Sequence, residues 1–223
     1  WYHPHANSTE QISRGLAGVL VVDEAERPEF DADEVIVLDD WRMTQEAQIH
    51  ASFDDWHDLS HAGRLGNYIT ANGQPDLRLT AAPGDRMRLR LVNTATARIF
   101  RLRLSGLRAW IAALDGMPLA QLQEADEVLI APAQRVDLIA DVTSGAGEEA
   151  VIGSVERDGT YATTVTRPDQ FRNYLIQQIG LLIRNHGQPV TIGVSDTPIP
   201  VHFAVASRPD LTVPQDGAAG FTL

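Results

Sequence analysis

Two histidines near the amino terminus have a spacing that suits a metal ion. His3 and His5 are separated by one proline in the string Trp-Tyr-His-Pro-His. Side chains alternate between the two faces of an extended backbone, so both imidazoles are expected to point to the same side. Neutral imidazole binds copper, zinc, iron or nickel. The pair is therefore a candidate metal site, although a His-x-His string also occurs on protein surfaces that bind no ligand.

A second histidine pair lies in the string Trp56-His57-Asp58-Leu59-Ser60-His61. Residues four apart on a helix share one face, so His57 and His61 are a second candidate metal pair. The alternative, which we favour from the sequence, is that both are solvated loop residues among neighbouring aspartates.

Three further groups have both a functional and a structural interpretation. His186 is either catalytic or part of a helix's last turn, where the helix dipole favours a partly cationic imidazole. Arg167 and Arg172 either contact a nucleotide phosphate or lie exposed on an amphipathic helix. The alternating arginines of 86–90 and 101–103 either bind an anion or form a solvated sheet face, and we favour the sheet face.

The composition excludes several kinds of site and partner. The 223 residues include no cysteine and no lysine, and their formal net charge is −12. Without cysteine the chain has no disulfide, no thiolate nucleophile and no cysteine-ligated copper of its own. An acidic chain is a poor match for nucleic acid, which favours clustered Lys and Arg. No apolar run approaches the length of a membrane span.

The elements that must position these residues read as short strands over the first 160 residues. Apolar residues alternate with arginine in Arg86–Leu91 and Phe100–Leu104, as in strands with one wet face. Turn signals occur at Asn72-Gly73, Pro83-Gly84 and Asp115-Gly116, and Asp137 is expected at a strand end. Regular short strands with few helices predict a β-sandwich. The expected strands are Leu16–Val22, Glu34–Leu38, Asn67–Ala71, Asp76–Thr80, Arg86–Val92, Phe100–Leu104, Ala109–Leu114 and Val136–Val142.

The pattern changes after residue 160. Thr166 begins an apolar-periodic run that ends at His186, which predicts a helix with start and stop signals. Pro189–Val194 reads as a strand, and a short helical turn is expected at Ser8–Gln11. The net negative charge lies in residues 1–160, whereas residues 161–223 are neutral overall, which favours a boundary between two units.

Strings in residues 1–159 resemble, in order, the three-domain, laccase-like multicopper oxidases. This resemblance implies cupredoxin domains and makes His3 and His5 ligands of the type 3 copper pair. In that family the pair belongs to a trinuclear copper centre that reduces dioxygen to water with electrons from a small reducing substrate. The strings are Trp1–Val22, Glu34–Trp41, Asn67–Gly73, Arg88–Asn93, Ala112–Pro118 and Ile130–Asp137.

Residues from about 160 to 223 resemble instead the N-terminal domain of AMP nucleosidase. The strings are Gly159–Leu175, Asn185–Gly187 and Val194–Phe203. That family hydrolyses AMP to adenine and ribose 5-phosphate, and the resemblance implies AMP or phosphate as a partner of this segment. It also implies two compartments, because the oxidases are periplasmic or extracellular and the nucleosidase is cytoplasmic.

We therefore predict a mainly β chain of the cupredoxin-like Greek-key type. Residues 1–42 are expected to be the end of one cupredoxin domain, 43–158 a nearly complete second one, and 159–223 a short α+β segment. Most copper ligands of the oxidases are missing, so we expect a fragment, joined to part of a nucleosidase, that contributes two type 3 histidines and is inactive alone. Two alternatives stay open: a nucleotide-responsive module of an AMP nucleosidase fused to foreign sequence, and a cupredoxin scaffold without copper.

Overall fold

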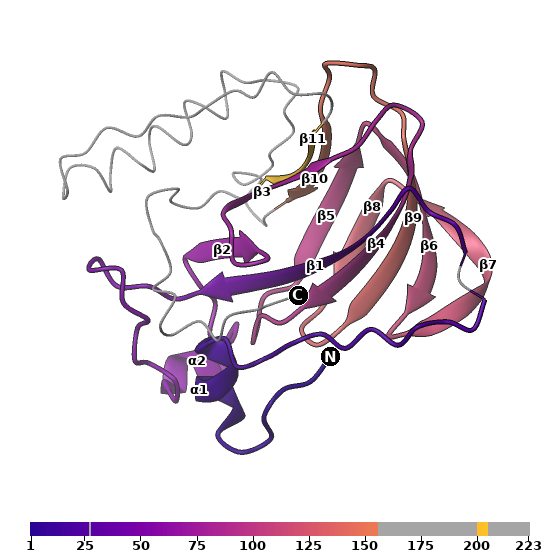
Figure 1. The fold of residues 1–223 in the computed structure, drawn as a ribbon. Helices are drawn as coiled ribbons and strands as arrows, with labels where there is room; N and C mark the ends of the chain where they lie inside the picture. Colours follow the sequence, from indigo (N-terminus) through magenta and orange to yellow (C-terminus); the bar gives the residue numbers. More distant parts are fainter. Residues whose placement is uncertain (27, 156–199, 205–223) are drawn as a thin grey trace.

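Two β-sheets pack face to face in the computed structural model, which describes residues 1–26, 28–155 and 200–204 (Figure 1). The six-stranded sheet has the order β2-β1-β4-β9-β6-β7, and the five-stranded sheet has the order β3-β11-β10-β5-β8. This arrangement confirms the expected mainly β sandwich. The strands of the first sheet are β1 (Ala32–Trp41), β2 (Tyr68–Ala71), β4 (Arg86–Asn93), β6 (Leu107–Leu114), β7 (Met117–Ala125) and β9 (Arg135–Val142). Those of the second are β3 (Asp76–Thr80), β5 (Phe100–Ser105), β8 (Glu127–Ile130), β10 (Ala150–Ser154) and β11 (Pro200–Ala204).

Apolar side chains from both sheets fill the space between them. Leu89 and Leu138 come from the six-stranded sheet, Leu102 and Ile152 come from the five-stranded sheet, and all four belong to one fully buried cluster. Alternation along each strand sends every second side chain into this core. Burying one such side chain contributes about 1.5–3 kcal/mol, so this cluster is what holds the two sheets together.

The strand β1 lies inside the six-stranded sheet. It pairs in parallel with β4 from Ala32↔Met87 to Leu38↔Asn93, and its end pairs antiparallel with β2. Ile36 and Leu38 join the core cluster. Parallel neighbours need a long connection, and here that connection carries a short helix, α2 (Trp56–Ser60), together with β2 and β3. The boundary at residue 42 stays a prediction.

The expected strands occur where the sequence placed them, with one exception. The strand expected at Leu16–Val22 was wrong: this segment forms a single bridge, between Gly18 and Tyr2. Leu20 and Val22 are 73% and 76% exposed, so the apolar run that suggested a buried strand has no neighbouring sheet to cover it in the part of the chain that the structure describes. The strands β7, β8, β10 and β11 were not predicted, and β7 is largely exposed and polar.

Two of the expected turns are built from residues with positive φ. Asn72 and Gly73 have φ of 49° and 72°, and Asp115 and Gly116 have φ of 51° and 82°. Both dipeptides join antiparallel neighbours, as the sequence predicted. The short helical turn is also confirmed as α1 (Ser8–Ser13). The helix ending at His186 and the strand Pro189–Val194 lie outside the described residues. No helix that the structure describes is long and apolar enough to cross a membrane.

The arginines of β4 do not form the solvated face that we expected. Arg88 and Arg90 are largely covered, and their guanidinium groups lie 2.8 Å from Asp137 and 2.7 Å from Asp33 respectively. Glu24 adds a third carboxylate, 2.9 Å from Arg88. Asp137 lies inside β9 rather than at its end. The prediction holds for β5, whose two arginines are about half exposed and share one carboxylate on β8.

A buried ion pair joins the end of β1 to the segments before β2 and after β4. Asp40 accepts hydrogen bonds from the Arg98 Nε, at 2.9 Å, and from the backbone N–H of Gly66. Arg98 also donates to the Gly66 carbonyl at 2.8 Å. A Cβ at Gly66 would lie 2.5 Å from the backbone nitrogen of Trp41, so only glycine fits at this close approach.

Replacing Asp40 by alanine should destabilise the fold strongly. The Asp40 side chain is 1% exposed, and its removal leaves the Arg98 charge buried without its carboxylate. Breaking such a pair costs about 3–5 kcal/mol, measurable as a shift of the urea midpoint. The matched control is Glu127→Ala, which removes a partly exposed carboxylate paired with Arg101 and should leave the midpoint unchanged. Equal shifts in both variants would contradict the role given to the buried pair.

The neighbouring residue Asp39 should make stability fall as the pH rises. Burial, reinforced by the charge of Asp40, raises the pKa of the Asp39 carboxyl to about 8. The folded state therefore binds an extra proton between the unfolded value near pH 4 and about pH 8, and stability is lost across that window by up to about 1.4 kcal/mol per pH unit. Denaturant titrations from pH 5 to pH 8 should show this slope in the wild type and a flatter one in Asp39→Asn. An identical slope in both proteins would refute the assignment.

Candidate metal centre

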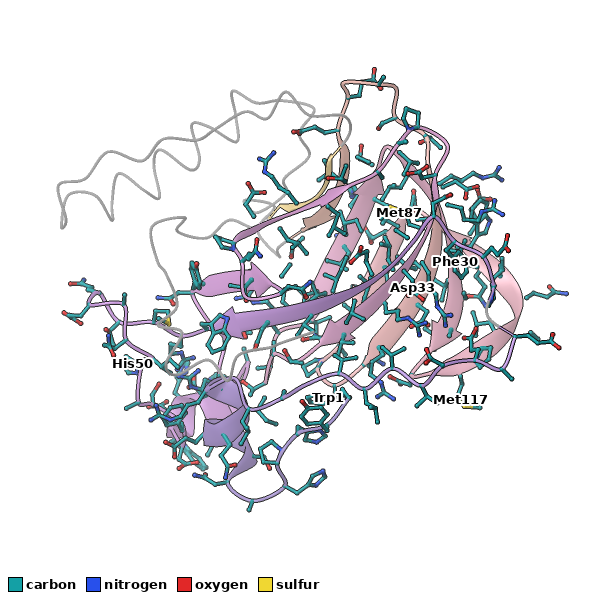
Figure 2. The ribbon with its side chains drawn as sticks, viewed as in Figure 1. Trp1, Phe30, Asp33, His50, Met87 and Met117 are labelled. Carbon is teal, nitrogen blue, oxygen red and sulfur yellow. The ribbon has the colours of Figure 1, made fainter. Side chains whose placement is uncertain are left out.

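His3 and His5 lie side by side, as the sequence predicted. Their ring centroids are 4.7 Å apart with an angle of 28° between the planes. Trp1 stacks on His3 at 4.1 Å, so the three rings form one aromatic group near the amino terminus. Figure 2 shows Trp1 beside the lower edge of the sandwich, well away from Met87 among its strands.

The His3 ring has a nitrogen that lacks a protein partner. Its Nδ1 atom is buried and makes no hydrogen bond, whereas the His5 side chain is exposed. A buried polar atom without a partner costs about 1–3 kcal/mol, and a bound cation satisfies an imidazole nitrogen as a hydrogen bond does. This donor set fits copper, because it offers two adjacent neutral nitrogen ligands on a constrained segment.

Gly18 positions the histidine segment, which sequence reasoning did not recognise. The Tyr2 N–H donates to the Gly18 carbonyl at 2.8 Å, and the Gly18 N–H donates back to the Tyr2 carbonyl at 3.0 Å. The Tyr2 ring lies over Gly18 so closely that a Cβ there would fall 2.2 Å from the Tyr2 hydroxyl oxygen. The signal was a glycine inside a run of leucine and valine, where a strand interior disfavours it.

Hydrogen bonds from α1 fix the chain just after the two histidines. The Ser8 hydroxyl donates to the Pro4 carbonyl at 3.0 Å, and the Gln11 amide donates to the Ala6 carbonyl at 2.7 Å. The backbone on both sides of His5 is therefore held by α1, and a ligand that depends on this segment depends on α1 as well.

His57 and His61 also lie together. Both belong to the α2 region, which shows that the helical interpretation was right and the loop interpretation wrong. Their rings stack with centroids 4.2 Å apart and an angle of 7°. His57 further belongs to a group with Asp55 and Asp58 whose potential ligand atoms all lie within 4.8 Å of one another.

The two helices lie at one end of the sandwich, outside both sheets (Figure 1). Arg14, next to α1, and Arg64, after α2, both place their guanidinium carbons 4.8 Å from the centre of the Phe53 ring. Cation–π contacts of this kind are attractive. Burial lowers the pKa of Arg64, whose charge the His50 and Ser52 carbonyls help to satisfy.

The other sequence candidates are not brought into either histidine group. Asp115 lies at the turn between β6 and β7, where it accepts a hydrogen bond from the backbone of Arg135. His186, Arg167 and Arg172 lie outside the described residues.

Two family models match the sequence. The multicopper oxidase model matches residues 32–148. The model of the bacterial AMP nucleoside phosphorylase N-terminus matches residues 97–222. Both resemblances are thus found, but the second begins well before residue 159, where we expected it to start, and it overlaps the first.

Known proteins show the same relationship. The multicopper oxidase mco of Staphylococcus epidermidis is 26% identical over 181 residues, which cover 78% of this chain and 39% of that protein. The cell division protein FtsP of Aggregatibacter aphrophilus is 30% identical over 159 residues, which cover 69% of this chain and 33% of that protein. The chain therefore spans about a third to two fifths of the length of these relatives.

A solved structure supports the assignment. The multi-copper oxidase from Pseudomonas thermotolerans superposes with a TM-score of 0.64 and 33% identity, over 68% of this chain and 37% of that one. Since the oxidase model also matches more than half of the sequence, the chain belongs to the multicopper oxidase family, and from residue 97 onward it also matches the family of the AMP nucleoside phosphorylase N-terminus.

Proposed function

We propose that this chain is part of a copper-dependent oxidase and supplies two imidazole ligands, His3 and His5, to its type 3 copper pair. The observation that carries the proposal is the stacked His3–His5 pair with the buried, unpartnered Nδ1 atom of His3. Family membership supplies the context, because multicopper oxidases use copper. The residues outside the pair hold it: Trp1 by stacking, and Gly18 by its two backbone hydrogen bonds to Tyr2.

In such an oxidase, the copper would accept electrons from a small reducing substrate and pass them to dioxygen, which leaves as water. The part of this chain is confined to binding and orientation. The two imidazoles donate neutral nitrogen, and the backbone on either side limits how far they can move. Rigid support of this kind keeps ligand atoms in place during electron transfer.

The chain alone should be inactive as an oxidase. Two imidazoles cannot satisfy a cluster of several copper ions, and the sequence has no cysteine for a type 1 centre. Further ligands must therefore come from sequence outside these 223 residues. We propose the same division as before: residues 1–42 from one cupredoxin domain and 43–158 from the next. For the oxidase we also propose a periplasmic or extracellular location.

A second candidate function rests on the match of residues 97–222 to the AMP nucleoside phosphorylase N-terminus. It is a nucleotide-responsive module that binds AMP or phosphate, with Arg167 and Arg172 as candidate phosphate contacts. Guanidinium groups suit phosphate because they donate two parallel hydrogen bonds.

A third candidate is a cupredoxin scaffold without copper. It is favoured by the likeness to FtsP, a relative named for cell division and not for oxidation. The His3–His5 pair argues against it, because a scaffold has no need of two adjacent imidazoles with an unpartnered buried nitrogen.

Copper titration of the full chain tests the first proposal. The double variant His3→Ala/His5→Ala should bind one Cu²⁺ fewer than the wild type, because a single ion can use both imidazoles of the pair. His50→Ala is the matched control, since His50 is exposed and its ring is bonded to Ser52. Equilibrium dialysis with metal analysis gives the stoichiometry. An unchanged copper content in the double variant would favour the scaffold.

Nucleotide titration of the full chain tests the second candidate. If the module is functional, AMP should bind with a dissociation constant below the millimolar range, and Arg167→Ala and Arg172→Ala should each weaken binding by roughly tenfold, the usual cost of a charge-assisted contact. Arg78→Ala on β3 is the control for a general loss of positive charge. Calorimetry that detects no heat of binding up to millimolar AMP would remove this candidate.

A further inference from the structure

The histidine pair of α2 forms a second group of metal-binding side chains, which the proposed oxidase function does not use. His57 and His61 are four residues apart, and their rings are nearly parallel at 4.2 Å. The same spacing on one helix face provides two ligands for zinc in helical metal sites. The pair is therefore already arranged as a bidentate chelate.

Hydrogen bonds determine which nitrogen of His61 is free. The His61 Nδ1 lies 3.1 Å from the His57 carbonyl oxygen and 2.9 Å from the Ser60 hydroxyl. A carbonyl can only accept, so this contact places the proton on Nδ1. The Ser60 hydroxyl donates to the Trp56 carbonyl at 2.8 Å, which leaves its oxygen free to accept from Nδ1 as well. The lone pair of His61 is thus on Nε2, and a carbonyl partner of this kind is the usual support of a metal-bound histidine.

Asp55 supplies a carboxylate beside His57. Its Oδ1 atom accepts hydrogen bonds from the backbone N–H groups of His57, at 3.0 Å, and Asp58, at 3.3 Å, which fixes the orientation of the carboxylate. Its ligand oxygen lies within 4.8 Å of the ligand atoms of His57 and Asp58. One oxygen of this carboxylate is used by the backbone, and the other remains available as a third ligand.

Asp58 has a different part, because Arg42 already occupies its carboxylate. The Arg42 Nη2 donates to one oxygen at 2.9 Å, and Nη1 donates to the other. This bidentate bond lowers the pKa of Asp58 and fastens α2 to the chain just after β1. The helix that carries the two histidines is therefore tied to the sandwich.

We propose that His57 and His61, with Asp55 as third ligand, bind one divalent transition-metal ion at a site separate from His3 and His5. Two imidazoles and a carboxylate suit Cu²⁺, Ni²⁺ and Zn²⁺, with Cu²⁺ bound most tightly in the usual order of affinities. The exposed position of both rings makes this a site for an exchangeable ion, open to solvent on one side.

Nickel titration in the His3→Ala/His5→Ala background isolates this site from the oxidase pair. We expect this protein to bind one equivalent of Ni²⁺ by calorimetry. His57→Ala and His61→Ala should each weaken binding by roughly tenfold or more, and Asp55→Asn by less. His50→Ala, which removes an exposed histidine elsewhere, should leave the affinity unchanged. Circular dichroism of each variant confirms that the fold is kept.

The same background loaded with one equivalent of Cu²⁺ gives a second measurement. Electron paramagnetic resonance should show coupling to two nitrogen nuclei, reduced to one in His61→Ala. The proposal is overturned if the His57→Ala/His61→Ala variant binds Ni²⁺ as tightly as its parent, or if the copper spectrum is the same in both. Since His3 and His5 are absent from all these proteins, the result does not depend on the proposed oxidase function.

Discussion

The parallel pairing of β1 with β4 is the contact on which the rest of the structure depends. It inserts the strand that follows the amino-terminal segment into the middle of the six-stranded sheet, between β2 and β4. Ile36 and Leu38 then enter the core shared by both sheets. Every candidate ligand in the described structure is attached to this strand, either through the chain before it or through α2 after it. A parallel pair cannot close locally, so this connection forms only when the whole sandwich forms.

Charge complementarity follows from that pairing. Once β1 lies beside β4, Asp33 meets Arg90, and Asp40 meets Arg98 at the other end of the strand. These contacts are more buried than the alternating sequence of β4 suggested, because the segment around Glu24 covers the outer face. Buried pairs of this kind contribute mainly by penalising arrangements that leave one charge unpaired. Asp39, which has no such cationic partner among the causes of its raised pKa, is instead kept protonated by burial.

The two histidine pairs differ in how they are built. His3 and His5 lie on a nearly extended segment, and their rings depend on Trp1 and on the close approach of Tyr2 to Gly18. His57 and His61 lie on a helix whose own spacing brings them together. The second pair therefore needs little beyond local structure, whereas the first needs contacts between Tyr2 and a residue sixteen positions away.

The sequence by itself determined the strand periodicity, the turns at Asn72-Gly73 and Asp115-Gly116, and the same-side placement of His3 and His5. These are consequences of alternation and of positive φ, which act over a few residues. Tertiary structure decided the rest. It left Leu16–Val22 without a neighbouring strand, covered the arginines of β4 with carboxylates, and made α2 a helix through the Asp55 cap and the Arg42–Asp58 bond. Those outcomes depend on which distant segment lies opposite, and burial and charge pairing between distant residues cannot be read from local spacing.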